Sequence, residues 1–547
     1  MHFPSPLSAF TYWEANKPDK FLFHQPFEDS VHHITYRAAG IEIRKIANGL
    51  IDLGYKPKSK IALLSKNCSH WIMADLAIQM AGYVSVPIYP TISAQSIDEI
   101  IVHSETKAVI IGKLDDYAAQ KPGVTACLRI GIKAYHINEE LSWEDFVDQN
   151  APLDVLPDQQ PEELLTIMYT SGTTGAPKGV MHKVGSFSKV TNTAIDVFGY
   201  RSETPKFFSY LPLTHIAERI GIEMFGLFIG GSFTFPYSLE TFSDDLSNTQ
   251  PNMFFAVPRI WTKFQEGILS KIPQKKLDLI LSIPIISSFF KKKIKAKLGL
   301  SKAINIFTGA APIALSQLEW YHKLGIEICQ AYGMTEDCVL SHFNYPGQNK
   351  FGTVGKPLPG VQIKFSSEDE ILIKSDCLML GYYKEPAMTK DMFTEDGFLR
   401  TGDIGEYDHE GYLIITGRIK DQFKTDKGKY ISPAPIEMEL MRNTDLDQVC
   451  IVGMGIPQPI ALVVLSQNAK NKSEIEIAAS LSQTVNELNP KLESVAKVQK
   501  VVIMKEDWTI DNGLLTPTLK VKRNRVEKIH QDMYKGWYDN EKMVIFE

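Results

Sequence analysis

The sequence predicts an α/β fold, with a large N-terminal domain built on a mostly parallel sheet and a small C-terminal α+β domain. Helical and strand-like patterns alternate over roughly the first 120 residues, which is typical of βαβ units. Near residue 418 the sequence changes to a short, charged stretch rich in Gly and Pro, as at a domain junction. With 547 residues, 44% hydrophobic and 22% charged, the chain is not disordered, collagen-like or a coiled coil.

The elements of the first domain follow from the spacing of apolar residues. Residues 36–53 have a helical period and stop before Gly54, so they predict an amphipathic helix. The apolar run 60–65 predicts a buried strand, 71–81 a helix and 83–88 the next strand. Strand, helix and strand at this spacing predict parallel pairing.

The domain boundary is placed at Lys420, within the charged stretch. This division gives an N-terminal domain of residues 1–419 and a C-terminal domain of residues 420–547. The second part is long enough for a small α+β domain with its own core.

Composition and charge exclude several classes of protein. The formal charge is −6, from 58 basic and 64 acidic residues, so no polycation predicts nucleic-acid binding. The six cysteines form no CxxC pair, which excludes the common zinc and redox motifs. The N-terminus lacks the basic and apolar regions of a signal peptide, and the most apolar run, 224–239, contains glycines, a proline and polar residues. We therefore expect a cytoplasmic protein.

One segment is strongly basic. Between Lys263 and Lys302 there are ten lysines against Glu266 and Asp278, around an apolar run at 277–290. The favoured interpretation is a helical hairpin with one packed apolar face and solvated lysines. The alternative is a peripheral contact with anionic lipid at the inner membrane surface. A membrane span is excluded by the run's length and by the proline inside it.

A loop rich in glycine and hydroxyl groups follows a short apolar, strand-like lead at 167–169. Small residues let backbone N–H groups approach an anion, hydroxyls add donors and a lysine adds charge, so the loop predicts a polyphosphate site. It is not a Walker A loop, because Ala176 and Pro177 interrupt the required spacing. The predicted contacts are Thr170, Ser171, Gly172, Thr173, Thr174, Gly175 and Lys178.

This loop resembles the signature loop of the adenylate-forming superfamily, and further blocks resemble the same superfamily in chain order. Several of them are similar to the long-chain fatty acyl-CoA synthetase branch in particular. The blocks are LPLTHIAER (211–219), FTGAAPI (307–313), QAYGMTE (330–336), GTVGKPLPG (352–360), GFLRTGD (397–403), GRIKDQFK (417–424) and TPTLKVKR (516–523).

The resemblance implies a large adenylate-forming domain, with mixed and parallel sheets sandwiched by helices, and a mobile C-terminal lid. It also implies an ATP-dependent acyl-CoA ligase. A long-chain fatty acid would attack the α-phosphorus of ATP to give an acyl-adenylate, and CoA would then form the thioester. Mg²⁺ is the implied cofactor. The alternative is a fatty acyl-AMP ligase, or acyl-acyl-carrier-protein synthetase, that passes the acyl group to a carrier protein.

The resemblance also assigns roles at the reacting centre. Lys520 matches the catalytic lysine that faces the carboxylate and the α-phosphate, where a cation offsets the approach of two anions. His215 corresponds to a position near the substrate carboxylate. Glu336 and Thr170 would hold Mg²⁺, which prefers hard oxygen ligands.

The nucleotide site extends beyond the loop. Asp403 matches the carboxylate that accepts both ribose hydroxyls, and Tyr332 would lie against the adenine ring. The complete set of further nucleotide contacts is Gly309, Ala310, Ala311, Gln330, Ala331, Tyr332, Gly333, Met334, Thr335, Asp403 and Arg418.

The remaining assignments concern the second step and the acyl group. Lys420 matches the hinge, because one pocket must first exclude water and later admit a thiol. Lys427, Gly428 and Lys429 would face CoA, and Trp261 would stand near the entrance of an acyl tunnel. A homodimer is left open.

Two other classes of protein are weighed against a ligase. A noncatalytic binding protein on a degenerate scaffold predicts damage at one or more functional positions, and all five expected residue types are present: Thr173, Lys178, Glu336, Asp403 and Lys520. A P-loop ATPase is disfavoured because the GK[ST] spacing is missing.

Overall fold

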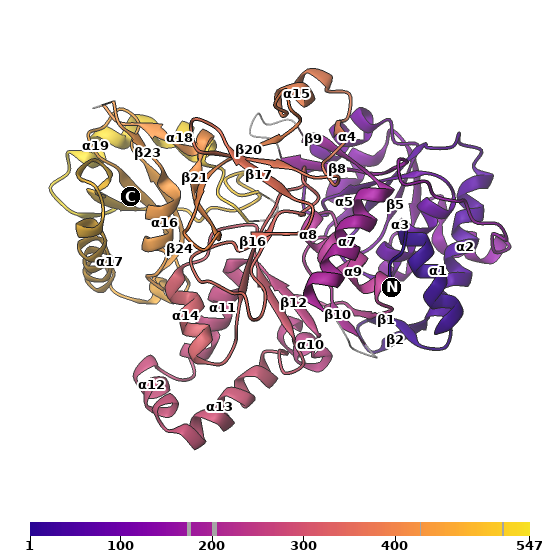
Figure 1. Ribbon diagram of the computed structural model, residues 1–547, viewed down its shortest axis with the longest axis horizontal. Coiled ribbons are helices and arrows are strands. Elements are labelled where there is room, and N and C mark those ends of the chain that lie inside the picture. Colours follow the sequence, from indigo (N-terminus) through magenta and orange to yellow (C-terminus); the bar gives the residue numbers. More distant parts are fainter. Residues whose placement is uncertain (172–176, 200–204, 427, 517–518) are drawn as a thin grey trace.

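The computed structural model describes residues 1–171, 177–199, 205–426, 428–516 and 519–547. Within these ranges the N-terminal part contains two large sheets and a smaller one, and the C-terminal part has its own four-stranded sheet. Figure 1 shows the two parts side by side, the first in indigo through magenta and pink to orange-red and the second in orange to yellow. The α/β class is confirmed.

The first large sheet confirms the predicted parallel pairing. From β8 to β7 neighbouring strands are parallel, whereas β9 and β19 are antiparallel to their neighbours. Strands β3 and β4 are buried along nearly their whole length, which is why they read as continuous apolar runs. In spatial order the described strands are β19 (Gly381–Tyr382), β9 (Pro177–Lys183), β8 (Leu164–Ser171), β4 (Val84–Ile88), β3 (Lys60–Leu64), β5 (Ala108–Ile111), β6 (Leu128–Gly131) and β7 (Leu141–Ser142).

The second large sheet is parallel in its centre and antiparallel at both edges. Its described strands, in spatial order, are β16 (Lys356–Pro357), β15 (His342–Phe343), β14 (Cys329–Tyr332), β13 (Asn305–Thr308), β12 (Met253–Ala256), β10 (Lys206–Phe208), β11 (Ser232–Thr234), β1 (Phe21–Pro26) and β2 (Val31–Thr35). The sheet brings together blocks that are far apart in the sequence.

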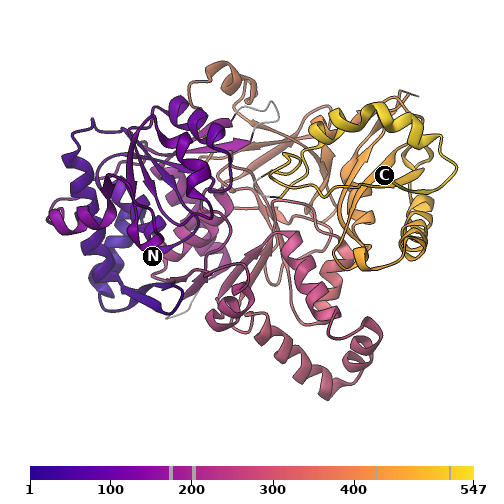
Figure 2. The same ribbon diagram turned by 180° about the vertical axis from the view of Figure 1, so that it is seen from behind.

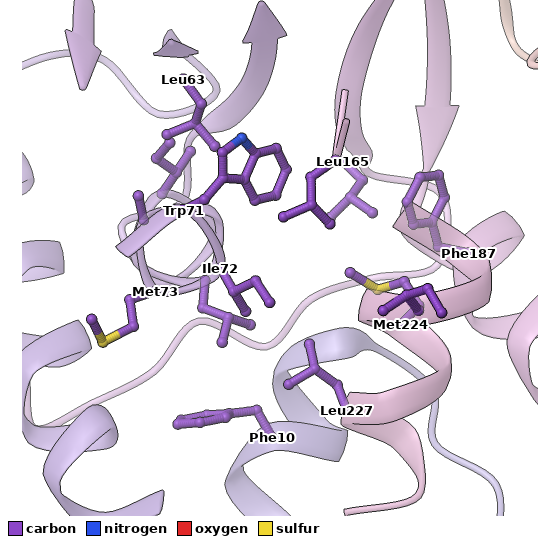
Figure 3. Close-up of a cluster of buried hydrophobic side chains, with 14 of the residues drawn as sticks. Phe10, Leu63, Trp71, Ile72, Met73, Leu165, Phe187, Met224 and Leu227 are labelled. Atoms are coloured by element: carbon purple, nitrogen blue, oxygen red, sulfur yellow. The ribbon is translucent and has the colours of Figure 1, made fainter. Parts of the chain in front are cut away.

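A shared core joins the two large sheets through the helices between them. Helix α3 (Ser69–Met80) packs on β3 and β4 and also contacts β1, so it is buried on every side. Figure 3 shows Trp71 and Ile72 of this helix among Leu165, Phe187 and Leu227. Helix α2 (Tyr36–Asp52) covers α3 and begins at the Thr35 N-cap. Both helices confirm the predictions at 36–53 and 71–81.

A smaller antiparallel sheet follows along the chain and carries two predicted site residues. It consists of β17 (Gln362–Phe365), β18 (Glu370–Lys374), β20 (Leu399–Tyr407) and β21 (Leu413–Arg418). Asp403 on β20 and Arg418 on β21 are direct register partners.

The C-terminal part is an α+β unit with its own cores. Helices cover both of its faces, and separate apolar clusters form around Val463 and Val502. Its elements are β22 (Phe423–Lys424), β23 (Tyr430–Ile431), α16 (Pro433–Leu440), β24 (Leu446–Val452), β25 (Ile460–Leu465), α17 (Glu474–Leu488), β26 (Lys500–Ile503), α18 (Arg523–His530), α19 (Tyr534–Tyr538) and β27 (Val544–Phe546).

The basic segment forms three helices, α11 (Pro258–Leu269), α12 (Gln274–Ser282) and α13 (Pro284–Lys297). Figures 1 and 2, seen from opposite sides, both show α12 and α13 extending from the body of the molecule. Among the described residues, every helix is too short or too polar to cross a bilayer. The other α-helices are α1 (Pro6–Asn16), α4 (Ala94–Ser104), α5 (Tyr117–Gln120), α6 (Trp143–Gln149), α7 (Val184–Phe198), α8 (Ile216–Glu218), α9 (Phe225–Phe228), α10 (Phe242–Thr249), α14 (Leu315–Lys323) and α15 (Pro386–Asp391).

Candidate functional site

The predicted phosphate loop connects two antiparallel strands, β8 and β9. Thr170 and Lys178 are register partners across this hairpin. The Lys178 ammonium lies 5.6 Å from the ring centroid of Tyr382, on the adjacent strand β19. The predicted contacts Gly172, Thr173, Thr174 and Gly175 lie outside the described residues, as does the side chain of Ser171.

Glu336 lies close to the same tyrosine. The Tyr382 hydroxyl donates a hydrogen bond of 2.8 Å to Glu336 Oε1. Burial raises the pKa of Glu336, while this hydrogen bond and the charges of Arg418 and Lys178 act in the opposite direction. In the described part of the chain Glu336 has no ion-pair partner, so its carboxylate is well placed to receive a cation.

The glycine and alanine positions assigned to the nucleotide gather at the carboxyl ends of β13 and β14, where parallel strands commonly hold ligands. A Cβ on Gly309 would lie 2.9 Å from the carbonyl oxygen of Ala331, so glycine permits this close approach. The next residue, Ala310, has a φ of 65°. Gln330, Tyr332, Gly333 and Met334 continue along and beyond β14.

The residues at the carboxyl ends of β13 and β14, together with Asp403 and Arg418, are called the wall of the candidate site below. His182 on β9 supports the end of the segment that follows β14. Its Nε2 atom lies 2.7 Å from the carbonyl oxygen of Thr335, and burial lowers its pKa to about 4. The neutral ring therefore donates to the carbonyl. This contact ties the segment before Glu336 to the strand that follows the phosphate loop. Asp337 holds the same segment, because its Oδ1 atom accepts a hydrogen bond of 2.9 Å from the Met334 N–H.

Asp403 is held by two donors on different elements. Tyr332 Oη donates to its Oδ2 atom at 2.8 Å, and Arg418 Nε donates to its Oδ1 atom at 2.5 Å. A third bond, from the Asp403 N–H to Thr401 Oγ1 at 3.1 Å, fixes the backbone. The carboxylate is thus fixed in orientation, and each oxygen keeps a further lone pair for a ligand.

Lys520 brings a cation from the C-terminal part to this wall. Desolvation and the charge of Arg418 lower its pKa to about 8, while Asp403 raises it. Its carbonyl accepts from the Thr516 N–H at 2.8 Å, and its own N–H donates to Thr516 Oγ1 at 3.0 Å. Next to it, a cavity of about 310 Å³ opens between the two parts of the chain, lined by Thr91 and Arg259 on one side and by Leu519 on the other.

His215 lies within electrostatic reach of Lys520. Burial, and then the charge of Lys520, lower the pKa of His215 to about 4. Its Nδ1 atom accepts from the Ala217 N–H at 3.3 Å and caps helix α8. The neutral ring therefore carries its proton on Nε2 and can act as a hydrogen-bond donor.

The segment that carries His215 is held by two buried residues. Asn67 accepts from the Leu213 N–H at 3.2 Å and donates to the Leu211 carbonyl at 2.7 Å. Glu218 Oε1 accepts from the Tyr210 N–H at 3.0 Å, and burial raises the Glu218 pKa to about 8. The sequence alone does not reveal Asn67 and Tyr382 as site residues, because neither lies in a recognised block. No local pattern reveals contacts over such long sequence separations.

The remaining predicted residues concern the hinge, the CoA contacts and the acyl tunnel. Lys420 is exposed in the short turn Ile419–Asp421, between β21 and β22. Gly428 and Lys429 form a turn whose hydrogen bonds, among the described residues, are all to Thr425, and Lys427 lies outside those residues. Trp261 is fully buried.

The surroundings of Trp261 are a closed aromatic cluster. Its ring lies 5.6 Å from Phe254 and 5.1 Å from Tyr321, measured between centroids. Such packing is typical of a core position. The tunnel assignment of Trp261 stays a prediction.

Comparison with known proteins decides the family. A family model described as AMP-binding enzyme matches residues 10–383, and one described as AMP-binding enzyme C-terminal domain matches residues 420–542. The chain belongs to the AMP-binding enzyme family. The resemblance stated from the motifs is thereby confirmed.

Curated relatives of this AMP-binding enzyme align over nearly its whole length. A long-chain-fatty-acid–CoA ligase of Xenopus laevis is 28% identical over 94% of this chain and 80% of its own. Long chain acyl-CoA synthetase 5 of Arabidopsis thaliana is 28% identical over 93% of this chain and 87% of its own. A long-chain-fatty-acid–CoA ligase of Mycobacterium bovis is 27% identical over 95% of both chains.

Solved structures share the fold of this AMP-binding enzyme. An anthranilate CoA ligase in complex with anthranoyl-AMP has a TM-score of 0.79 at 18% identity, over 96% of this chain and 97% of the other. The didomain of a carboxylic acid reductase from Segniliparus rugosus, in complex with AMP, has a TM-score of 0.80 at 19% identity, over 98% and 82%. At these identities the likeness concerns the fold alone.

Proposed function

We propose that this protein is an AMP-forming, long-chain fatty acid–CoA ligase that works through an acyl-adenylate. The observation that supports this most is the electrostatic coupling of Lys520 with Arg418, Asp403 and His215. It brings a cation from the C-terminal part to the wall formed by the N-terminal blocks. The curated relatives, which are long-chain-fatty-acid–CoA ligases and acyl-CoA synthetases, support the substrate class.

In the first step a carboxylate approaches the α-phosphate, and two anions must meet. At 4 Å and an effective dielectric constant near 20, each charge pair costs about 4 kcal/mol. With a pKa of about 8, Lys520 is mainly protonated at pH 7 and can offset this repulsion. The Nε2–H of His215 would donate to the carboxylate and orient it.

The nucleotide would be held by residues of the N-terminal part. Asp403 would accept the ribose hydroxyls, and Tyr332 would support the adenine ring. Lys178 and Thr170 would face the β- and γ-phosphates beside the loop. Tyr332 and Asp403 are already oriented by their mutual hydrogen bond, which reduces the entropy lost on binding.

Mg²⁺ fits the residues present. Glu336 offers a hard oxygen ligand, and burial raises its pKa, so a nearby divalent cation would favour its ionised form. Thr170 would be the second protein ligand. Among the described residues no three acidic, His or Cys side chains form a metal cluster, so the remaining ligands would be phosphate oxygens and water. The ion would neutralise charge on the phosphates.

In the second step a thiolate would attack the acyl carbon and release AMP. Lys420 would be the hinge about which the C-terminal part rotates. This rotation would move Lys520 out of the site and bring in the turn at Gly428 and Lys429, together with Lys427. That turn would then face CoA. The charges of Arg418 and Asp403 act on Lys520, which supports its role in the first step, and the second step would then require the C-terminal part to rotate.

The decisive experiment is a CoA-dependent assay of AMP release across chain lengths from about C2 to C18, repeated with a holo-carrier protein in place of CoA. We expect CoA-dependent release with a maximum at long chains. Release with the carrier alone would favour the acyl-carrier alternative. If AMP were released neither with CoA nor with the carrier protein, both proposed functions would be contradicted.

A further inference from the structure

The α12–α13 hairpin has one packed face and one apolar face open to solvent. Leu277 and Ile294 are buried in the same apolar cluster as Trp261. On the other face Leu279, Ile285 and Phe289 are 65%, 87% and 72% exposed. Isolated exposed apolar residues are normal, but a group of large ones on one projecting element marks an interaction surface.

The exposed side chains of α13 form a continuous stripe. Ile285, Ser288, Phe289 and Lys292 are spaced at i, i+3, i+4 and i+7, which puts them on one side of a helix. Together with Pro284 they line a shallow groove. Figures 1 and 2 both show this helix running from the tip of the projecting hairpin back toward the body, so that a flat surface could reach its N-terminal half.

A dense, unpaired positive charge surrounds the stripe. None of the ten lysines between Lys263 and Lys302 has an ion-pair partner in the described part of the chain, whereas lysines elsewhere, such as Lys350 and Lys470, pair with carboxylates. Lys292 and Lys293 are exposed one turn beyond Phe289. The surface therefore combines an apolar stripe with uncompensated cations.

We infer that the α12–α13 hairpin docks this protein on an anionic phospholipid surface. Lysines would meet lipid head groups while Ile285 and Phe289 enter the interface, as in interfacial amphipathic helices. The charge argues against a second copy of the chain as occupant, because a two-fold contact would bring like lysine clusters together. This docking is additional to the proposed ligase activity and is measured without ATP, CoA or fatty acid.

The test is co-sedimentation with vesicles of phosphatidylcholine containing roughly 30% phosphatidylserine, compared with phosphatidylcholine alone. We expect binding to the anionic vesicles only, weakened by salt. The double variant Ile285→Ser/Phe289→Ser should lose about tenfold or more in partitioning. Lys292→Gln/Lys293→Gln should lose a similar amount.

Matched controls come from the rest of the surface. Val155 and Ile475 are as exposed as Ile285 but lie elsewhere, and Lys505 and Lys542 are exposed lysines of the C-terminal part. Their Ser and Gln substitutions should leave vesicle binding unchanged. Equal loss in these controls, or no loss in the hairpin variants, would overturn the inference.

Two further readouts keep the result unambiguous. Phe289→Trp should give fluorescence that lipid-borne quenchers reduce on anionic vesicles, whereas Ile475→Trp should not. Equal binding of the wild type to neutral vesicles would overturn the inference. So would a dimer in lipid-free solution that Ile285→Ser/Phe289→Ser dissociates, because a second copy would then be the occupant.

Discussion

Arg418 and Asp403 face each other across β20 and β21, and Nε of the arginine donates to Oδ1 of the carboxylate at 2.5 Å. The arginine side chain is 54% exposed and the aspartate side chain 6%. The aspartate is thus oriented by Tyr332 at one carboxylate oxygen and by Arg418 at the other. One pair of neighbouring strands therefore positions both the proposed acceptor for the ribose diol and a cation whose charge lowers the pKa of Lys520.

Removing the charge of Asp403 should weaken nucleotide binding. We expect Asp403→Asn to reduce ATP-dependent pyrophosphate exchange by about one to two decades, because a charged acceptor is lost and Arg418 is left without its partner. The matched control is Asp396→Asn, an exposed carboxylate before β20 whose partner is Lys364. Exchange at the wild-type level in Asp403→Asn would contradict the ribose role.

Lys520 should matter for the first half-reaction more than for the second. Lys520→Ala should slow adenylate formation by about two to three decades, roughly 3–4 kcal/mol of transition-state stabilisation. Thioester formation from supplied acyl-adenylate should be largely spared. Lys528→Ala, an exposed lysine on α18, is the control. An equal loss in both half-reactions would show that Lys520 has another role.

The pKa of Lys520 gives a stability prediction with a definite sign. The folded pKa is about 8, below the ordinary value of 10.5, so the unfolded chain binds this proton more strongly. The charged side chain therefore destabilises the fold below pH 8, and the effect fades as the pH rises to 10.5. Because Lys520 is exposed, solvent screens part of this effect, so we expect Lys520→Gln to raise the melting temperature only slightly at pH 7 and to lose that advantage by about pH 10.5. Melting curves of both proteins over this range, with Lys528→Gln as control, would check it.

Glu218 shows the opposite dependence. Burial raises its pKa to about 8 from 4.5, so the folded protein holds a proton that the unfolded chain releases. The stability from this group is complete below pH 4.5 and is lost as the pH rises through 8. Glu218→Gln, a neutral near-isostere, should therefore gain stability relative to the wild type between these pH values and above. Denaturant midpoints at pH 5 and pH 9 test this, and a difference that does not grow with pH would contradict a protonated Glu218.

Local patterns predicted what depends on local physics. The helix at 36–53 and the strand at 60–65 follow from periodicity and continuous burial, and the structure contains both. The contact between Tyr382 and Glu336 could not be predicted, because it depends on β19 pairing with β9 across the first sheet. The neighbours of Trp261 could not be predicted either, since the sequence does not distinguish an apolar residue that lines a tunnel from one that fills a core.

The hinge assignment of Lys420 is tested by restricting its backbone. Lys420 lies in a short exposed turn between β21 and β22, where rotation of few dihedral angles would move the whole C-terminal part. Lys420→Pro fixes φ near −65° and should allow adenylate formation while stalling transfer to CoA. Lys420→Ala removes the same charge but leaves the backbone free, so it should retain both steps. If single-turnover measurements showed rapid transfer to CoA in Lys420→Pro, rotation would have to occur elsewhere; if Lys420→Ala stalled equally, the side chain and not the backbone would be responsible.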